Sequence, residues 1–201
     1  MGQPTWETMM HDAVKKMLEQ LAPHSVEFSD EHFADTPNRV VKMFRECFGG
    51  PSLHAAKEVL SRSFVQTGVQ YGAENEMVHV NGIHFVSYCA HHLVPFVCTG
   101  HFAYIPTKRV VGLSKVVRLI EIVARRPQVQ EILTNQVVEI FQEVVEPRGC
   151  AFVVDAKHMC MIARGVRNAS SWTRTSALRG VLFQPAARQE FFASVPAYKE
   201  S

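Results

Sequence analysis

Apolar side chains recur at helical spacing near the start of the chain, with polar residues between them: Trp6, Met9, Met10, Val14, Met17, Leu18 and Leu21. This spacing predicts an amphipathic helix over residues 5–21. Asp35-Thr36-Pro37 is typical of a helix start with proline in the first turn, and Gly49-Gly50 is typical of a helix end. The sequence therefore predicts two amphipathic helices, which form an N-terminal helical arm over residues 1–64.

The pattern changes after about residue 64 to the alternation that is typical of β-strands. Met77–Val80 and Ile83–Tyr88 alternate apolar and polar residues on either side of Asn81-Gly82. Asn-Gly between two such runs predicts a β-hairpin. Further strands are predicted over 97–105, from Cys150 to as far as Met161, and over Val181–Phe183.

Helical spacing returns between these strands. Ser114 is suited to cap a helix over 115–125, and Pro127 to open a second helix over 128–145. The apolar side of the second helix is predicted to comprise Val129, Ile132, Leu133, Val137, Ile140, Phe141 and Val144. A short terminal helix is predicted over 188–195. This order of elements predicts an α+β fold with an antiparallel sheet.

Composition and charge narrow the function classes. The chain has 201 residues, of which 47 % are hydrophobic and 20 % charged, which excludes a disordered chain and fits one globular domain with an appended helical segment. Its 21 Lys and Arg residues against 19 Asp and Glu give a net charge of +2, which provides no indication of nucleic-acid or membrane binding. No apolar run approaches the roughly 20 residues needed to span a bilayer.

Cysteine usage points to a reducing compartment. The count is odd, with five cysteines, and the N-terminus lacks the basic-then-apolar pattern of a signal peptide. Both observations disfavour a disulfide framework. We therefore expect a cytoplasmic protein whose cysteines are reduced.

The tetrapeptide Cys89-Ala90-His91-His92 is a candidate metal-binding element. Cys89 and His92 are three residues apart, so on a tight turn both can reach one metal, a spacing common in zinc sites. The alternative is a buried cysteine beside a polar pair of surface histidines.

His158-Met159-Cys160 supplies a second element. If this stretch is a strand, the side chains at 158 and 160 point to the same face, so Cys160 could be a third ligand with His158 beside it. Three protein ligands leave zinc an open fourth position, the arrangement of catalytic sites. Cys98 is the competing ligand and would close the site, but its apolar strand favours core packing. Cys47 and Cys150 also fit the core.

Other polar residues suit catalysis and anion binding. His91 and His158 could act as acid–base groups because the pKa of histidine lies near neutrality, although either could instead be hydrogen-bonded in the core. Lys115 and Arg118 share a helix face near a helix N-terminus and could hold a polyanion there, although exposed cations are usually only solvated. Arg164 follows the second element by a few residues.

Five blocks in this order closely resemble the GTP cyclohydrolase I family: Asp35-Thr-Pro-Asn-Arg39-Val-Val-Lys42-Met, Cys89-Ala-His-His92, Gly112-Leu-Ser-Lys115, Arg126-Pro-Gln-Val-Gln130-Glu131 and His158-Met-Cys160-Met-Ile-Ala-Arg164-Gly. The resemblance runs from about Asp35 to Phe183. It implies the tunnelling fold for residues 65–201, in which sheets and helix pairs from several subunits close into a barrel. It further implies a homodecamer with active sites between subunits.

The resemblance also implies the roles of individual residues. It assigns Zn²⁺ to Cys89, His92 and Cys160, and catalysis to His158 and His91 with Ser114 and Gln130 in support. Glu131 would recognise guanine, because one carboxylate can accept hydrogen bonds from N1–H and the 2-amino group together. The triphosphate would be held by Lys115, Arg118, Arg164, Arg39 and Lys42, the last two from a neighbouring chain.

The implied reaction opens the imidazole ring of GTP by hydrolysis, releases formate and yields 7,8-dihydroneopterin triphosphate, a step of pterin and tetrahydrofolate biosynthesis. One position departs from the family pattern, because Ala90 stands where the family has Glu. The departure leaves two alternatives open: a variant that stops at a ring-opened formamidopyrimidine or prefers a modified purine nucleotide, and a non-catalytic nucleotide-binding homologue. The segment from Asn168 to Arg174, with Trp172, has no assigned role.

Overall fold

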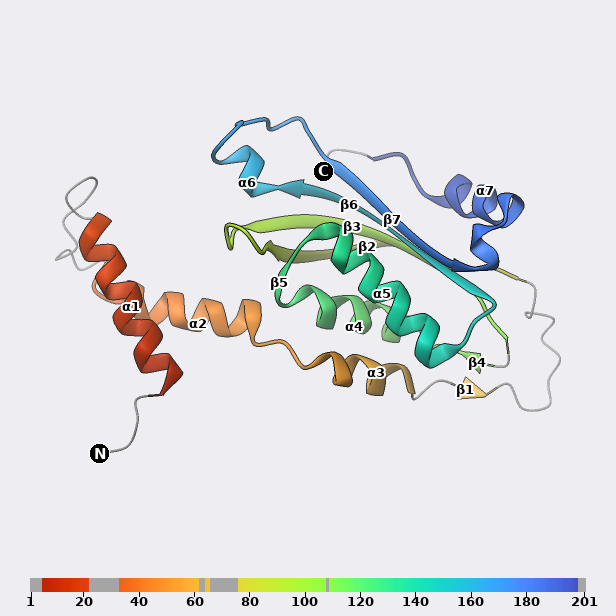
Figure 1. Ribbon diagram of the computed structural model, residues 1–201, viewed down its shortest axis with the longest axis horizontal. Helices are drawn as coiled ribbons and strands as arrows, with labels where there is room; N and C mark the ends of the chain where they lie inside the picture. The colour runs from red at the N-terminus through yellow and green to blue at the C-terminus, as the bar shows by residue number, and fades with distance from the viewer. Residues whose placement is uncertain (1–4, 22–32, 62–63, 66–75, 108, 199–201) are drawn as a thin grey trace. The chain divides into compact units, whose positions relative to one another are not determined.

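The computed structural model describes residues 5–21, 33–61, 64–65, 76–107 and 109–198, which are drawn in colour in Figure 1. The chain divides into two compact units, Met1–Gly49 and Gly50–Ser201. Within the described residues, no helix combines the length and the apolar character needed to cross a membrane. The first unit is helical in its described part, and the second carries the sheets.

The described part of the first unit consists of α1 (Trp6–Leu21) and α2 (Thr36–Phe48), which confirms the two predicted helices. The helices pack on each other and bury Val14 and Val41. Asp35 is the N-cap of α2 and Gly49 its C-cap, as the turn residues predict. The apolar spacing and the residues at the helix ends therefore predict α1 and α2 correctly.

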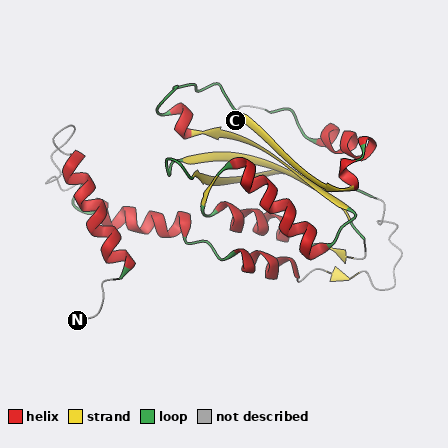
Figure 2. Cartoon of the chain, viewed as in Figure 1, coloured by secondary structure: helices red, strands yellow, loops and turns green. Residues whose placement is uncertain are grey.

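A twisted sheet forms the centre of the second unit (Figure 2). Its strands are β2 (Val78–Cys89), β3 (Pro95–Ile105), β5 (Pro127–Gln128), β6 (Gly149–His158) and β7 (Thr173–Gly180). The order is β5-β2-β3-β6-β7, and every pair is antiparallel except β2–β5. A small second sheet pairs β1 (Phe64–Val65) with β4 (Arg109–Val110). The mostly antiparallel sheet confirms the predicted α+β class.

Helices cover both faces of this sheet (Figure 1). The helices α4 (Leu113–Ala124) and α5 (Gln130–Val145) pack on one face, and α7 (Pro185–Ser194) packs on the other. The helix α3 (Leu53–Ser61) packs against α4 and α5. Alternation along β3 divides its side chains between the two cores: Phe102 and Tyr104 join the α4–α5 core, whereas Ala103 and Ile105 join the α7 core. The strands are therefore buried on both faces over this stretch.

The predicted hairpin at Asn81-Gly82 is wrong. Val78 to Tyr88 pair with β3 in one long ladder, whose register shifts between Val80 and Ile83. Gly82 adopts a φ of +72° at this irregularity, a conformation that glycine reaches without strain. The turn signal marks a β-bulge because a long ladder on one partner strand outweighs the local preference.

The predicted last strand, Val181–Phe183, is also wrong. These residues form a 3-10 turn, and the last strand is β7, which pairs with β6 from Ala156↔Thr173 to Gly149↔Gly180. The strand has the polar sequence Thr-Arg-Thr-Ser-Ala-Leu-Arg-Gly and lacks a plain apolar alternation. An edge strand is held by main-chain pairing on one side only and does not need such a pattern.

Several boundaries differ from the sequence predictions. Helix α4 begins at Leu113 with Gly112 as its N-cap, so Ser114 lies inside the first turn. Pro127 belongs to β5, and α5 begins only at Gln130. Ile132, expected on the apolar side, is 51 % exposed. The predicted terminal helix is confirmed as α7, which begins earlier than expected, at Pro185, whereas α3 was not predicted.

Candidate metal centre and active site

The turn after β2 presents Cys89 and His92 on one side. The amides of His92 and Leu93 both donate to the carbonyl of Cys89, at 3.2 and 2.8 Å, and Leu93 takes a φ of +54°. The amide of Ala90 donates to the carbonyl of Gln128 in β5 at 2.9 Å. The bond to β5 therefore fixes the start of this turn. The chain reverses direction within the turn, which brings the ring of His92 close to the sulfur of Cys89.

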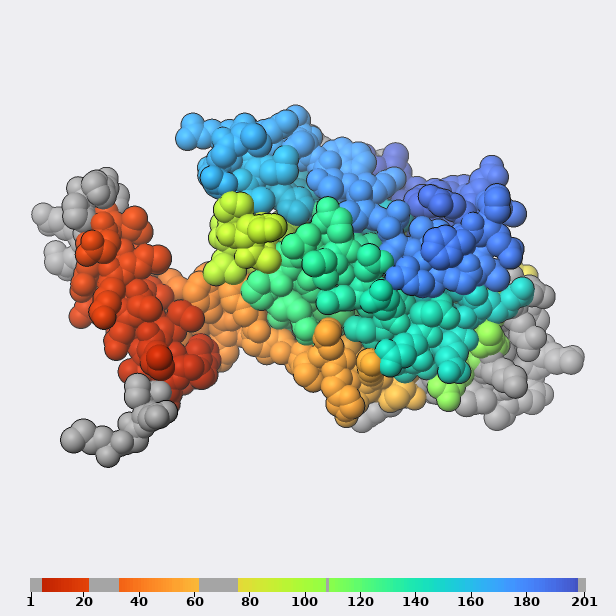
Figure 3. Space-filling view, viewed as in Figure 1, coloured from red at the N-terminus to blue at the C-terminus, as the bar shows by residue number. Residues whose placement is uncertain are grey.

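Cys160 reaches the same place from β6, because β2 and β6 both end beside the start of β3, where Ser87 and His158 pair with Phe96. Strand β6 ends at His158, and Met159–Ile162 form a helical turn, α6. The prediction of a strand running through Met161 is therefore wrong, and Cys160 approaches from a helical turn. Figure 3 shows the yellow-green turn after β2 beside the blue segment after β6.

Ligand atoms of Cys89, His92 and Cys160 all lie within 4.8 Å of one another. The Cys89 Sγ to His92 Nδ1 distance is 3.6 Å. Tetrahedral zinc bonded to sulfur and nitrogen at its usual bond lengths separates the two ligand atoms by about 3.5 Å. The donor set and its spacing therefore fit a zinc ion bound by two sulfurs and one imidazole.

Electrostatics at this group favour a cation. Burial raises the pKa of the Cys160 thiol, and the adjacent Cys89 sulfur raises it further by charge repulsion and by a hydrogen bond. Two thiolates this close repel each other unless a cation lies between them. A bound metal ion is the natural partner because cysteine coordinates as the thiolate.

The remaining cysteines lie elsewhere. Cys98 is 1 % exposed, its Sγ donates to the carbonyl of Phe96, and burial raises its pKa. Burial likewise raises the pKa of Cys150 to about 12. Cys47, expected in the core, is half-buried in α2. Among the described residues, the metal-type cluster therefore has three members and lacks a fourth protein ligand.

His158 lies beside this group and is held by Gln130. The His158 Nε2 to Gln130 Oε1 distance is 2.7 Å, and the ring of Phe96 stacks on the imidazole at 4.7 Å between centroids. Burial lowers the pKa of His158, while the nearby Glu131 carboxylate acts in the opposite direction. The imidazole is thus fixed in orientation and biased toward its neutral form.

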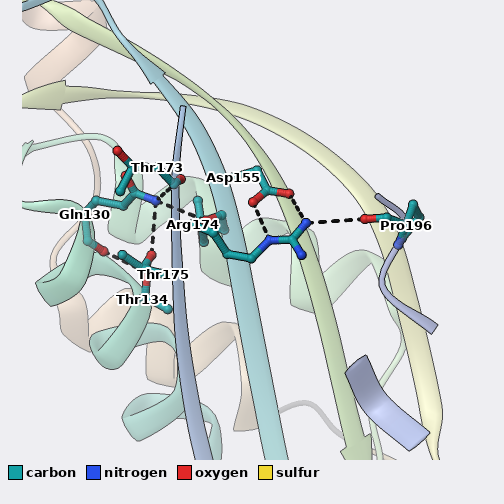
Figure 4. A network of polar contacts seen from close by, with 8 residues as sticks. Gln130, Thr134, Asp155, Thr173, Arg174, Thr175 and Pro196 are labelled. Atoms are coloured by element: carbon teal, nitrogen blue, oxygen red, sulfur yellow. Dashed lines mark hydrogen bonds and ion pairs between the residues drawn. The ribbon is translucent and has the colours of Figure 1, made fainter. Parts of the chain in front are cut away.

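Gln130 is itself fixed by the sheet (Figure 4). It is 3 % exposed, and its Nε2 donates to the carbonyls of Val154 and Thr173 at 3.0 and 3.1 Å and to Thr175 Oγ1 at 3.1 Å. The amide nitrogen is therefore committed to β6 and β7, and only the oxygen can face His158.

Two further predicted residues lie at the metal group. His91 is exposed, with Nδ1 3.7 Å from Cys89 Sγ. Arg164 lies with Nη1 3.0 Å from His92 Nε2. A guanidinium can only donate, so His92 Nε2 accepts here and Nδ1 carries the ring hydrogen. A metal bound at Nδ1 would require the tautomer with the hydrogen on Nε2, which could no longer accept from Arg164, so this contact belongs to the metal-free site.

Other predicted residues do not belong to the Cys–His–Cys group. Within the described residues, the side chains of Ser114, Lys115 and Arg118 make no hydrogen bond or ion pair to the Cys–His–Cys group, since all three lie on α4. Arg39 and Lys42 are exposed on α2 of the first unit, where Arg39 pairs with Asp35. Glu131 is exposed in the first turn of α5, next to Gln130.

Some residues that shape the site escaped the sequence analysis. Phe96 stacks on His158, Thr175 fixes Gln130, and the buried carboxylate of Asp155 pairs with Arg174. Each is brought in by strand pairing between β3, β6 and β7. The sequence around Arg174 assigns it no role, because a short motif does not indicate which residue on a neighbouring strand will pair with it.

Comparison with known proteins agrees with this geometry. A family model described as GTP cyclohydrolase I matches residues 10–196. GTP cyclohydrolase 1 of Campylobacter jejuni subsp. jejuni serotype O:23/36 (strain 81-176) is 42 % identical over 190 residues, which cover 94 % of this chain and 95 % of that protein. GTP cyclohydrolase 1 of Streptomyces avermitilis is 45 % identical over 169 residues, covering 83 % and 81 %.

Among solved structures, the archaeosine synthase QueF-Like in the apo form matches with a TM-score of 0.44 and 15 % identity, over 52 % of this chain and 93 % of that chain. So distant a likeness has no bearing on activity. The family match, in contrast, spans almost the whole chain. This chain belongs to the GTP cyclohydrolase I family.

Proposed function

We propose that this protein hydrolyses GTP to formate and 7,8-dihydroneopterin triphosphate. Ring opening and formate release each consume one water, and closure of the pterin ring returns one. Family membership supports the GTP cyclohydrolase activity. The single observation that carries the mechanism is the convergence of Cys89, His92 and Cys160 within 4.8 Å, beside a histidine held by a buried glutamine.

Zn²⁺ is the proposed cofactor. The ligands would be the two cysteines and His92, because two thiolates and an imidazole suit this metal. An ion held in this way keeps an open position and lowers the pKa of a water there to about 7. The absence of a fourth ligand among the described residues supports a catalytic rather than a structural site.

The proton transfers are assigned to histidines of the chain. His158, with Nε2–H donated to Gln130, presents Nδ1 for exchange of a proton with N7 of the purine ring. Because burial lowers its pKa, the imidazole releases a proton readily after protonation. His91, exposed beside Cys89, is the proposed second acid–base group, and Ser114 supports from α4.

Recognition of the substrate divides between base and phosphate. Glu131 would accept from N1–H and the 2-amino group of guanine, and adenine lacks this donor pair. Arg164 at the metal group, with Lys115 and Arg118, would bind the triphosphate. Among the described residues, Lys115 and Arg118 on α4 make no hydrogen bond or ion pair to the metal group of their own chain. We propose that they serve a site shared between subunits, together with Arg39 and Lys42.

The same reasoning leads to the proposed assembly and setting. Sheets of several subunits would close into the barrel of the tunnelling fold, as a cytoplasmic homodecamer, with residues 65–201 as the catalytic domain. The product would enter pterin and tetrahydrofolate biosynthesis. Sedimentation of the purified protein measures the subunit number, and a monomer with full activity would exclude shared sites.

Ala90 motivates a second candidate function, a cyclohydrolase that stops at the ring-opened formamidopyrimidine. Ala90 is exposed in the turn between the two ligands Cys89 and His92. A carboxylate at this place could orient a ligand of the metal or tune a bound water, and this chain lacks it. Product analysis separates the two candidates.

The test is incubation of the zinc-loaded protein with GTP, ITP and ATP. We expect formate and neopterin triphosphate from GTP, slower turnover of ITP, which lacks the 2-amino group, and none of ATP. Chelation should abolish the reaction. A formamidopyrimidine as sole product would support the second candidate, and GTP binding without turnover would show a non-catalytic homologue.

A further inference from the structure

The residues that follow α7 contact the residues at the beginning of β7. We name Pro196–Tyr198 the C-terminal strap. The rings of Tyr198 and Trp172 stack with centroids 4.4 Å apart and planes 18° from parallel. Arg174 Nη2 donates to the carbonyl of Pro196 at 3.3 Å, as Figure 4 shows. Trp172 and Arg174 therefore both hold the strap.

The Arg174 side chain is fixed in position by its ion pair with Asp155. Its Nε and Nη2 donate to the two carboxylate oxygens of Asp155, each at 2.7 Å, and Asp155 is 2 % exposed. The Asp155 carboxylate raises the pKa of Arg174. The guanidinium also lies 5.4 Å from the centre of the Trp172 ring. A bidentate pair of this kind fixes the guanidinium plane, and with it the tryptophan and the strap.

Trp172 ends the segment that carries Arg164. We name residues 163–171 the Arg164 segment. Its path is tight, because Gly165 and Arg167 both have left-handed φ values of +63° and +50°. Asn168 ties the segment to α6, since its amide donates to the carbonyl of Met161 at 3.0 Å. One end of the segment is thus fixed by α6 and the other by Trp172.

The segment has few other anchors. All its residues are exposed except Ser171, and the side chain of Val166 is 72 % exposed. Asn168 Oδ1 accepts from the amides of Ser170 and Ser171, which stiffens a local turn without joining the segment to the sheet. On the side of α6, Arg164 is held by main-chain bonds, since the amide of Arg167 donates to the Arg164 carbonyl and that of Asn168 to the Met161 carbonyl. On the side of β7, the stack of Trp172 on Tyr198 is the side-chain contact that anchors the segment.

We propose that Trp172 and Tyr198 are positioning residues that hold Arg164 at the mouth of the metal site, where it binds the phosphates of the substrate. The proposal rests on the proposed function. It assigns a role to the C-terminal strap, which supports a phosphate-binding arginine through ring stacking. The stacking contact is made by the ring of Tyr198, and among the described residues its hydroxyl has no hydrogen bond.

The catalytic histidine is secured separately. Thr173, which follows Trp172, pairs with Ala156 in the β6–β7 ladder, and its carbonyl accepts from Gln130. Loss of the strap leaves these main-chain contacts in place. The proposal therefore predicts an effect on substrate binding with little effect on the chemical step.

The experiment compares Tyr198→Ala with Tyr198→Phe, and with Phe183→Ala as a control at an exposed aromatic residue outside the strap and the Arg164 segment. Loss of a stacked ring pair should raise the KM for GTP about 3- to 10-fold. We expect kcat to change less than about 2-fold, zinc content to stay constant, and Tyr198→Phe and Phe183→Ala to behave as the parent. An unchanged KM in Tyr198→Ala overturns the proposal.

A double variant tests the route through Arg164. In an Arg164→Ala background, Tyr198→Ala should add no further increase in KM, because the residue it positions is gone. Additive effects of the two substitutions would show that Tyr198 acts by another route and would contradict the proposal.

Two readouts do not depend on turnover. In a Trp6→Phe background Trp172 is the only tryptophan, and Tyr198→Ala should shift its emission to the red as the ring becomes exposed. Amide exchange over residues 163–171 should accelerate in the same variant. If the parent protein is inactive, the proposed function is wrong, but these two readouts still test whether Tyr198 holds Trp172 and the Arg164 segment. Unchanged emission and unchanged amide exchange in Tyr198→Ala would overturn the proposal.

Discussion

His158 Nε2 lies 2.7 Å from Gln130 Oε1, while the amide nitrogen of the same glutamine donates to β6 and β7. Because a glutamine offers a donor at one end and an acceptor at the other, this commitment leaves only the oxygen for the imidazole. His158 therefore carries a hydrogen on Nε2, which leaves Nδ1 of the neutral ring as an acceptor. The sheet sets the tautomer of the histidine.

This relationship predicts the effect of Gln130→Ala. Without the acceptor the ring can rotate and change tautomer, so kcat for formate release should fall about 10- to 100-fold, less than removal of the acid–base group itself would cause. The KM for GTP should change little. Gln20→Ala, at an exposed position in α1, is the matched control. A kcat equal to that of the parent would show that the contact does not orient His158.

Substitution of the cysteines should separate metal binding from packing. Cys160→Ala should lose bound zinc and activity together, as measured by metal analysis and formate release. Cys98→Ala removes a buried sulfur from the core, so it should lower the free energy of unfolding by about 1 kcal/mol while zinc remains bound. If Cys98→Ala lost the metal instead, Cys98 would be a ligand and the site would be closed.

The Ala90→Glu substitution tests the departure from the family pattern. The residue is exposed, so the longer side chain should change the free energy of unfolding by less than about 0.5 kcal/mol. We expect the product to remain neopterin triphosphate and only the rate to change, because position 90 is not a ligand. A switch of product from formamidopyrimidine to neopterin triphosphate would instead establish the second candidate function.

His101 should give the fold a pH dependence. The ring is 4 % exposed, and burial lowers its pKa, with Arg174 and His84 acting the same way and Asp155 opposing. The unfolded chain, with a histidine pKa near 6.5, then binds more protons below neutrality. The free energy of unfolding should therefore fall as the pH drops from about 7 to 5.

His101→Asn should flatten this slope in denaturant titrations. Asparagine keeps an acceptor for the amide of Gly82, which donates to His101 Nδ1 at 3.4 Å. His54→Gln is the control, since the His54 side chain is 79 % exposed. Equal slopes in His101→Asn and the parent would mean that another group causes the acid sensitivity.

Local chemistry sufficed for much of this protein. The helices α1 and α2 follow from apolar spacing and from Asp35 and Gly49 at the ends of α2. The Cys89–His92 spacing indicated a metal site, because a turn brings residues three apart together whatever the rest of the fold does. Strand alternation predicts Cys160 as a third candidate ligand, and the residue does lie with Cys89 and His92, but it does so from a helical turn and not from a strand.

Only the tertiary structure decided how distant segments pair. It made Asn81-Gly82 a bulge instead of a hairpin, turned the polar stretch after Trp172 into β7, and brought Tyr198 onto that tryptophan. The reason is physical: strand register and side-chain stacking depend on partners far away in the chain, and a local pattern holds no information about which partner is present. The sequence alone determined the candidate metal ligands and the helices α1 and α2, and long-range packing determined what holds His158 and Gln130 in place.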